Sequence, residues 1–167
     1  MANILTSANF IDDCQLSIST ITEVQSAFTA FLTKMEVEFM RKVLGVKLYA
    51  EFVVAWASTP TTGKWYDLIN GGIYETDFYF KGLKSALTYY SYVKYQQSKS
   101  SITVANGNIQ NNQDHATVIN VSTNVISANN NCIDICDEVP LFCATESIFD
   151  NLMYSRPFKK HYNILGI

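Results

Sequence analysis

The 167-residue sequence is poor in the residue types from which common catalytic sites are built. It has two histidines, His115 and His161, and neither stands in a recognisable frame with a serine or cysteine nucleophile. The pair Gly71-Gly72 lacks the spacing and the lysine of a phosphate-binding loop. Acids that are adjacent in sequence do not face each other on a helix or strand, so the two adjacent acid pairs are poor acid–base dyads. The sequence therefore favours a structural or binding protein over an enzyme.

Basic residues are missing from a long part of the chain. No Lys or Arg occurs between Lys99 and Arg156, a span that contains six Asp or Glu residues. The last twelve residues then carry Arg156, Lys159 and Lys160 and no acid. This pattern predicts attraction between an acidic middle and a basic tail, within one chain or between neighbouring chains. Three positive charges are too few to predict DNA binding, and the formal net charge of −3 gives no overall pull towards nucleic acid.

Long hydrophobic runs are also missing. No stretch reaches the roughly 18 to 20 apolar residues that a membrane-spanning helix requires. The N-terminus, MANILTSANF, has neither the basic region nor the apolar run of a signal peptide. The sequence therefore predicts a protein of cytosolic origin that does not enter a membrane.

The four cysteines, Cys14, Cys132, Cys136 and Cys143, leave two interpretations open. In a protein of cytosolic origin they are expected to be reduced thiols that pack as small hydrophobic side chains. Alternatively, the one-turn spacing of Cys132 and Cys136, with Cys143 seven residues further on, could form part of a zinc site. A fourth ligand would have to come from a residue distant in sequence, which favours buried thiols and no cofactor.

Hydrophobic and aromatic residues make up 48% and 13% of the chain, and many of them recur at helical spacing. Thr20 and Glu23 fit a capping box, which predicts a helix from about Ile21 to Leu44. Gly45 then stands where a left-handed residue would end that helix. Further helices are predicted over residues 46–57 and 64–70.

The most strongly patterned helix is predicted from about Asp77 to Ser98. Its apolar residues repeat at steps of three and four and indicate one buried stripe, whereas Tyr89, Tyr92 and Tyr95 lie on other faces. Rigid amphipathic rings suit interfaces, so these three tyrosines are candidates for contact with a second copy of the chain. Core packing is the open alternative for each ring. Gly82, early in this helix, would permit close approach of another backbone.

The pattern changes after Ser98. Residues 101–105 (SITVA) are β-like, and Asn106-Gly107 is a strong hairpin signal. Nine asparagines over residues 106–131 predict a polar loop or arm that is either disordered or ordered against a neighbour. The remaining predictions are a helix over 115–127, a helix over 132–138 that ends before Pro140, a helix over 145–154 and an extended tail over 158–167.

Together these patterns predict a mainly α-helical fold, a small helical bundle with a short β-hairpin or arm and an extended C-terminal tail. The expected division is an N-terminal extension (1–19), a helical bundle core (20–98), a hairpin with an Asn-rich arm (99–131), and a C-terminal helix and tail (132–167).

Several motifs follow one another in a familiar order. They are LGVKLY at 44–49, WYDLINGG at 65–72, KGLKSAL at 81–87 with YYSY at 89–92, and TVANGNI at 103–109. Over about residues 20–112, their order and spacing resemble the head–tail connector proteins (adaptor or ring proteins) of tailed bacteriophages. The resemblance is to the type carried by phages of Bacteroides-like hosts, including the crAss-like group. The Asn-rich arm and the cysteine-containing C-terminal part depart from this pattern.

The resemblance implies a structural virion protein that performs no catalysis and is made in the bacterial host cytoplasm. Its copies would assemble into a ring, typically of twelve, that stacks under the portal protein at one capsid vertex and joins it to other neck or tail proteins. DNA would pass through the ring without specific binding. Two alternatives stay open, another neck component such as a stopper or tail-completion protein, and a small metal-binding protein that uses Cys132, Cys136 and Cys143.

Within this interpretation the C-terminal tail is the candidate partner-binding element. Its residues combine positive charge with aromatic rings, as interface anchors do. The candidates are Arg156, Phe158, Lys159, Lys160, His161 and Tyr162. The second candidate surface, for contact between subunits, is the one formed by Tyr89, Tyr92 and Tyr95.

Overall fold

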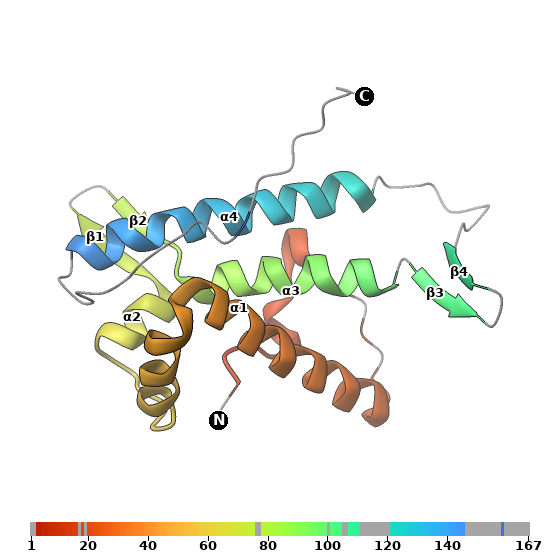
Figure 1. Ribbon diagram of the computed structural model, residues 1–167, viewed down its shortest axis with the longest axis horizontal. Coiled ribbons are helices and arrows are strands. Elements are labelled where there is room, and N and C mark those ends of the chain that lie inside the picture. Colours follow the sequence, from red (N-terminus) through yellow and green to blue (C-terminus); the bar gives the residue numbers. More distant parts are fainter. Residues whose placement is uncertain are drawn as a thin grey trace.

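The computed structural model describes residues 3–16, 18, 20–75, 78–99, 101–104, 107–110, 121–145 and 158. Within them the chain forms four α-helices and two two-stranded antiparallel sheets, which confirms the predicted mainly helical fold (Figure 1). The helices are α1 (Thr22–Trp56), α2 (Lys64–Asn70), α3 (Leu83–Lys99) and α4 (Val121–Thr145). Strand β1 (Gly72–Glu75) pairs with β2 (Phe78–Phe80), β3 (Ser101–Val104) pairs with β4 (Gly107–Gln110), and two short 3-10 turns, η1 (Ser7–Asn9) and η2 (Asp12–Cys14), precede α1.

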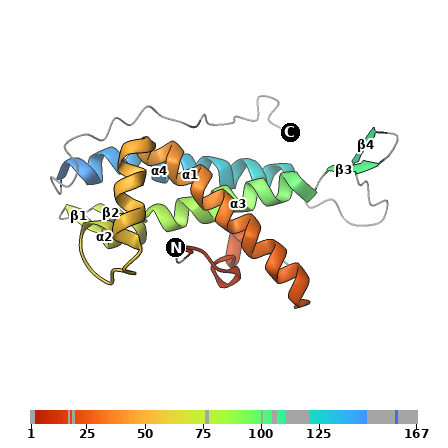
Figure 2. The same cartoon turned by 60° about the horizontal axis from the view of Figure 1, so that its bottom comes forward.

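Helices α3 and α4 lie side by side and form the centre of the core (Figures 1 and 2). The apolar stripe predicted for α3 is buried, since Leu83, Ala86 and Leu87 have no exposed surface. On α4, Cys136 and Val139 are equally buried. Each helix thus places one apolar face in the core, which is the arrangement that the three- and four-residue spacing indicates.

Helix α1 consists of two helical segments that meet at Gly45. This residue has φ 73° and ψ 171°, outside the helical region, so the predicted break after Leu44 is confirmed. Helix α1 begins at Thr22, close to the predicted start at about Ile21, but Ile21 is the N-cap and no side chain caps the helix. The capping box of Thr20 and Glu23 is therefore not formed.

The N-terminal residues pack into the bundle, where the sequence indicated an extended or partly ordered lead. Ile4, Leu5 and Phe10 are buried, as is Cys14 in η2. The ring of Phe10 lies edge-on to that of Phe28 in α1, with centroids 5.5 Å apart. Residues 3–16 thus contribute directly to the hydrophobic core.

Strands β1 and β2 form a hairpin where the sequence predicted the first turn of the tyrosine helix, so that prediction is wrong for residues 78–82. Phe80 is fully buried, and its ring stacks on Phe142 of α4 at 4.7 Å. Phe80 belongs to β2 and not to α3, so it enters the core from the strand, outside the apolar stripe of the helix. Helix α3 therefore begins only at Leu83.

Helix α4 continues through Pro140, whereas the sequence predicted a helix that ended before it. Proline in a helix interior costs about 3 kcal/mol because it removes a hydrogen bond and crowds the preceding turn. Burial of Phe142 and Cys143 beyond the proline offsets this cost. The predicted boundary between 131 and 132 consequently falls inside α4.

The hairpin predicted after the tyrosine helix is confirmed, with Ile102 opposite Ile109 and Val104 opposite Gly107. Of the Asn-rich arm predicted over 106–131, residues 111–120 lie outside the described residues, whereas residues 121–131 form the first part of α4, so the arm prediction is wrong there. The helix predicted over 115–127 agrees with α4 from Val121 onward. The helix over 145–154 beyond Thr145, and the tail apart from Phe158, lie outside the described residues. Among the helices that the structure describes, none combines the length and apolar character needed to cross a membrane.

The backbone passes very close to itself at Gly71 and Gly82, where α2 ends and α3 is about to begin. Both glycines have positive φ, 82° and 81°. A Cβ on Gly71 would overlap the carbonyl oxygen of Phe80 and the amide nitrogen of Gly82, and a Cβ on Gly82 would overlap the amide nitrogen of Gly71. The close backbone approach predicted for Gly82 is thus confirmed.

We expect Gly71→Ala or Gly82→Ala to lower the free energy of unfolding by at least about 2 kcal/mol, because each adds overlap to an unfavourable backbone conformation. Gly72→Ala is the matched control, since a Cβ there meets nothing within 4 Å, and it should change stability by no more than about 0.5 kcal/mol. Urea unfolding followed by circular dichroism measures all three variants. If Gly71→Ala and Gly72→Ala lowered the free energy of unfolding equally, this account of the close backbone approach would be wrong.

Candidate functional site

An aromatic side chain from the C-terminal tail is held in a site between α1 and α3. The ring of Phe158 stacks on Phe39 of α1, with centroids 5.8 Å apart and planes at 15°. It also meets Tyr90 of α3 at 5.7 Å, and the Lys42 ammonium lies 6.0 Å from its centroid. We call the site formed by Phe39, Lys42 and Tyr90 the aromatic socket.

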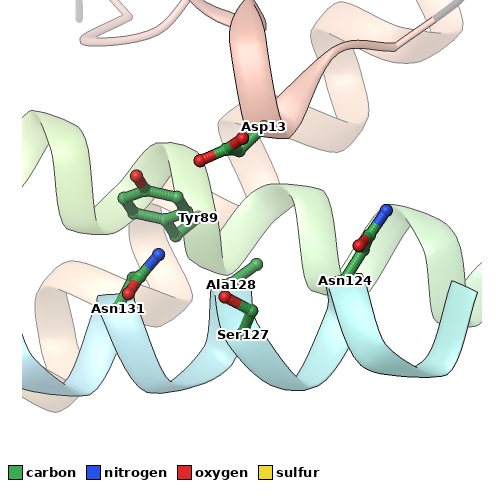
Figure 3. Close-up of a pocket in the computed structure, with 6 residues that line it drawn as sticks. All are labelled: Asp13, Tyr89, Asn124, Ser127, Ala128 and Asn131. Carbon is green, nitrogen blue, oxygen red and sulfur yellow. The ribbon is translucent and has the colours of Figure 1, made fainter.

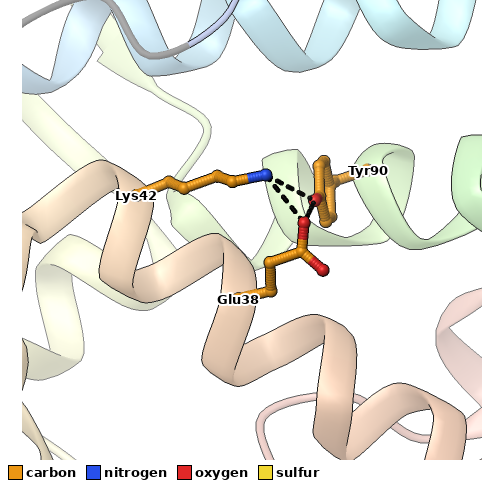
Figure 4. A network of polar contacts seen from close by, with 3 residues as sticks. All are labelled: Glu38, Lys42 and Tyr90. Carbon is orange, nitrogen blue, oxygen red and sulfur yellow. Dashed lines mark hydrogen bonds and ion pairs between the residues drawn. The ribbon is translucent and has the colours of Figure 1, made fainter.

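A polar network fixes one wall of the aromatic socket (Figure 4). The Tyr90 hydroxyl donates a hydrogen bond to Oε1 of Glu38 at 2.7 Å. Lys42 Nζ lies 2.7 Å from the same oxygen and donates to the Tyr90 hydroxyl at 3.3 Å. Because Glu38 and Lys42 come from α1 and Tyr90 from α3, the network links the two helices at the place where Phe158 binds.

The ionisation of this network follows from its contacts. Hydrogen bonds from Lys42 and Tyr90, with the charges of Lys42 and Lys94, lower the pKa of Glu38. Burial, and then the hydrogen bond to Glu38, raise the pKa of Tyr90. At neutral pH Glu38 is therefore a carboxylate and Tyr90 a protonated phenol. Nζ of Lys94 lies 5.6 Å from the Tyr90 ring centre.

A polar groove lies on another side of α3, between η2 and α4 (Figure 3). Its cavity of about 150 Å³ is lined by Asp13 from η2, Tyr89 from α3, and Asn124, Ser127, Ala128 and Asn131 from α4. Asp13 and Tyr89 also line a second hollow of about 260 Å³ together with Asp12 and Thr88. The two hollows therefore share Asp13 and Tyr89 in their linings.

The polar groove presents a carboxylate, amides and hydroxyls. Tyr89 forms a side-chain hydrogen bond with Asn131, and burial, with smaller contributions from Cys14 and Asp13, raises its pKa. None of the described residues that line the groove is basic. Such a surface suits a hydrogen-bond donor or a cationic group.

The three tyrosines proposed for a subunit interface have different surroundings in the single chain. Tyr92 is buried, which agrees with the core-packing alternative for that ring. Tyr95 is half-buried and lies edge-on to Phe28 and Phe31 of α1, at 5.2 and 5.6 Å. Tyr89 is also half-buried and faces the polar groove. Contact of Tyr89 or Tyr95 with a second copy stays a prediction.

The tail residues are represented by Phe158 alone. It occupies the aromatic socket of its own chain, a contact that the sequence analysis did not predict. The other tail candidates lie outside the described residues, namely Arg156, Lys159, Lys160, His161 and Tyr162. The i,i+4 spacing of Glu38 and Lys42 was visible in the sequence, but nothing in it indicated their contact with Tyr90.

All four cysteines are free and buried. Burial raises the pKa of Cys143 and, with Asp13, that of Cys14, each to about 12. A hydrogen bond with Cys132, together with burial, raises the pKa of Cys136. In the part of the chain that the structure describes, no group of three or more His, Cys, Asp or Glu side chains is placed to hold a metal ion. This geometry gives the zinc alternative no support.

One buried acid was not singled out by the sequence analysis. Glu36 in α1 is only 5% exposed, and its Oε2 accepts a hydrogen bond from the backbone N–H of Ile4 at 2.8 Å. Burial raises the pKa of this carboxyl, although the hydrogen bond from Ile4 opposes the shift. Glu36 thereby ties the N-terminal segment to α1.

Comparison with known proteins finds no match to this chain among protein-family models, curated proteins or solved structures.

Glu36 and Glu38 should affect stability with opposite dependence on pH. The folded-state pKa of Glu36 is raised above the ordinary value of 4.5, so between these two pKa values the folded chain binds more protons than the unfolded chain. The free energy of unfolding therefore falls as pH rises from the unfolded-state pKa through the folded-state pKa. Glu36→Gln keeps an acceptor for Ile4, and we expect it to be more stable than the wild type at pH 7, with the difference vanishing at low pH.

The pKa of Glu38 is lowered, so its stabilising contribution is present above the unfolded value and is lost as pH falls through the folded value. Glu38→Gln should therefore be less stable than the wild type at pH 7, and the two should converge in acid. Urea unfolding between pH 3 and pH 8 measures both variants. If the stability of both variants relative to the wild type changed with pH in the same direction, the pKa shifts assigned to Glu36 and Glu38 would be wrong.

We expect the native protein to react slowly with maleimide and the unfolded protein to react rapidly at four thiols. All four native thiols are buried and therefore shielded, and the raised pKa values of Cys14 and Cys143 also keep those two thiols protonated. Mass spectrometry after short labelling, with and without urea, counts the modified cysteines. Rapid native labelling at Cys132 or Cys143 would show that α4 does not pack as described.

Proposed function

We propose that this chain is the subunit of an oligomeric ring in the neck of a tailed bacteriophage, joining the portal protein to the tail around the DNA channel. The ordered motifs described above suggest the phage connector class. The structural observation that supports self-assembly is a pair of exposed apolar surfaces at the two ends of the molecule.

The first surface is on the β1–β2 hairpin. Ile73 lies opposite Tyr79 in the register, so both side chains are on the same face of the hairpin. They are 74% and 64% exposed, whereas Phe80 of β2 is fully buried. We call Ile73 and Tyr79 the hairpin surface. Its side chains extend from a strand pair that Phe80 holds on α4.

The second surface is the N-terminal end of α1. All residues from Thr22 to Ala27 are exposed. This end of the helix projects from the body on the side away from the β1–β2 hairpin (Figures 1 and 2). Ile21 and Val24 are 56% and 38% exposed there. Two helical turns without buried residues gain little from tertiary packing in a single chain.

A ring needs two different surfaces on each subunit, because its contacts are head-to-tail and heterologous. The hairpin surface and the α1 end are different in structure and lie at separate ends, which suits such a contact. The role requires binding surfaces and no catalytic group, and a chain of net charge −3 suits a channel that lets DNA slide. Portal binding and a copy number near twelve belong to the same proposal.

We expect Ile73→Lys combined with Tyr79→Lys to weaken self-association while leaving the fold intact, because both side chains are exposed in the single chain. Thr61→Lys, at an exposed loop position, is the control for added positive charge. Light scattering coupled to size exclusion, and electron microscopy with portal rings of the same phage, measure assembly. Circular dichroism checks the fold of each variant.

A wild-type chain that stays monomeric at high concentration and does not join portal rings would overturn the proposed function. Assembly of the double variant equal to that of Thr61→Lys would remove the hairpin surface from the interface.

A further inference from the structure

The aromatic socket receives Phe158 across a long connection. Phe158 contacts Phe39 and Lys42 of α1 and Tyr90 of α3, and the described residue that precedes it in the chain is Thr145, at the end of α4. Twelve residues, 146–157, separate Thr145 from Phe158. Extended, such a connection reaches about 45 Å. The described contacts of Phe158 are therefore with helices distant from it in sequence.

Contacts that do not involve the tail also hold the socket walls. The Glu38, Lys42 and Tyr90 network holds α1 against α3 through hydrogen bonds of 2.7 and 3.3 Å. Phe39 is a fully buried residue of α1. Contacts of this kind limit how far the walls can move, which lowers the cost of binding a phenyl ring.

The electrostatics around the socket do not hold the tail firmly. Two ammonium groups, Lys42 and Lys94, lie within 6 Å of the Tyr90 ring centre, and Glu38 already pairs with Lys42. The residues next to Phe158 in sequence are basic as well, since Arg156, Lys159 and Lys160 flank it. Like charges oppose docking, so ring stacking and cation–π contact supply the attraction. Phe158 itself remains half-exposed.

We propose that the aromatic socket is an exchangeable site that, in the assembled protein, takes Phe158 from a second copy of the chain. Docking in cis and in trans makes the same contacts, so the exchange costs no contact energy and links neighbouring copies. Each subunit would bind Phe158 of one neighbour in its socket and place its own Phe158 in the socket of the other neighbour. This contact is heterologous, as a ring requires. The inference rests on the proposed ring function for the presence of that neighbour.

Cross-linking between two different chains tests the exchange. One chain carries Lys94→Cys at the edge of the socket, and the other carries Lys159→Cys beside the anchor. The four native thiols are buried, so a short bismaleimide should react mainly with the new cysteines. In the mixture, a dimer that joins the two variants should form efficiently when the tail of one copy lies at the socket of the other.

The matched control is the Lys159→Cys chain that also carries Phe158→Ala. We expect the mixed dimer to exceed this control by about tenfold or more, because the control lacks the ring that anchors the tail. Phe158→Trp in place of Phe158→Ala should restore the dimer, since the socket selects an aromatic ring. A single chain with both cysteines reports docking in cis as a cross-linked monomer.

The outcomes separate this inference from the proposed function. If light scattering shows oligomers of the mixture but the mixed dimer does not exceed the control, the exchange is refuted and the ring proposal stands. If the chain stays monomeric with and without portal rings, both are refuted. Oligomers with an abundant mixed dimer that depends on Phe158 support the exchange.

Discussion

The structure depends on the burial of α3 from more than one side. Its apolar stripe, with Leu83, Ala86 and Leu87 fully buried, lies in the core beside α4, and Tyr90 contacts α1. A single helix of this length would be marginal in water, so its stability comes from these tertiary contacts. The candidate sites follow from the same arrangement, because the aromatic socket uses Tyr90, which continues the buried stripe, and the polar groove uses Tyr89 beside it.

Local patterns in the sequence predicted the elements whose stability is local. The break at Gly45 was predictable because only a residue that tolerates positive φ ends a helix in that way, and the β3–β4 hairpin was predictable from Asn106-Gly107. The bounds of α2 were also predicted, with glycines on either side of it. The capping box at Thr20 was wrong although its sequence signal is local, so such a motif is not sufficient when the helix end is exposed.

The remaining features depend on contacts between distant residues. The N-terminal core residues Ile4, Leu5 and Phe10 have no helical or strand period, and only the tertiary structure shows that they are buried. The β1–β2 hairpin and the part of α4 beyond Pro140 meet where Phe80 stacks on Phe142, a contact that no local pattern indicates. The aromatic socket was equally hidden, because its parts lie on α1, on α3 and near the C-terminus. The sequence did indicate that Phe158 is an anchor, but not that its own chain offers a site for it.

Tyr89 and Tyr90 are adjacent in α3 and point to different sites, one to the polar groove and the other to the aromatic socket. A small rotation of α3 about its axis would displace both rings together. Any ligand whose binding in the groove depends on such a rotation would alter the affinity of the socket for Phe158, and Phe158 would alter the affinity of the groove by the same factor. Because one helix carries both tyrosines, a change in its packing would act on the groove and on the socket together.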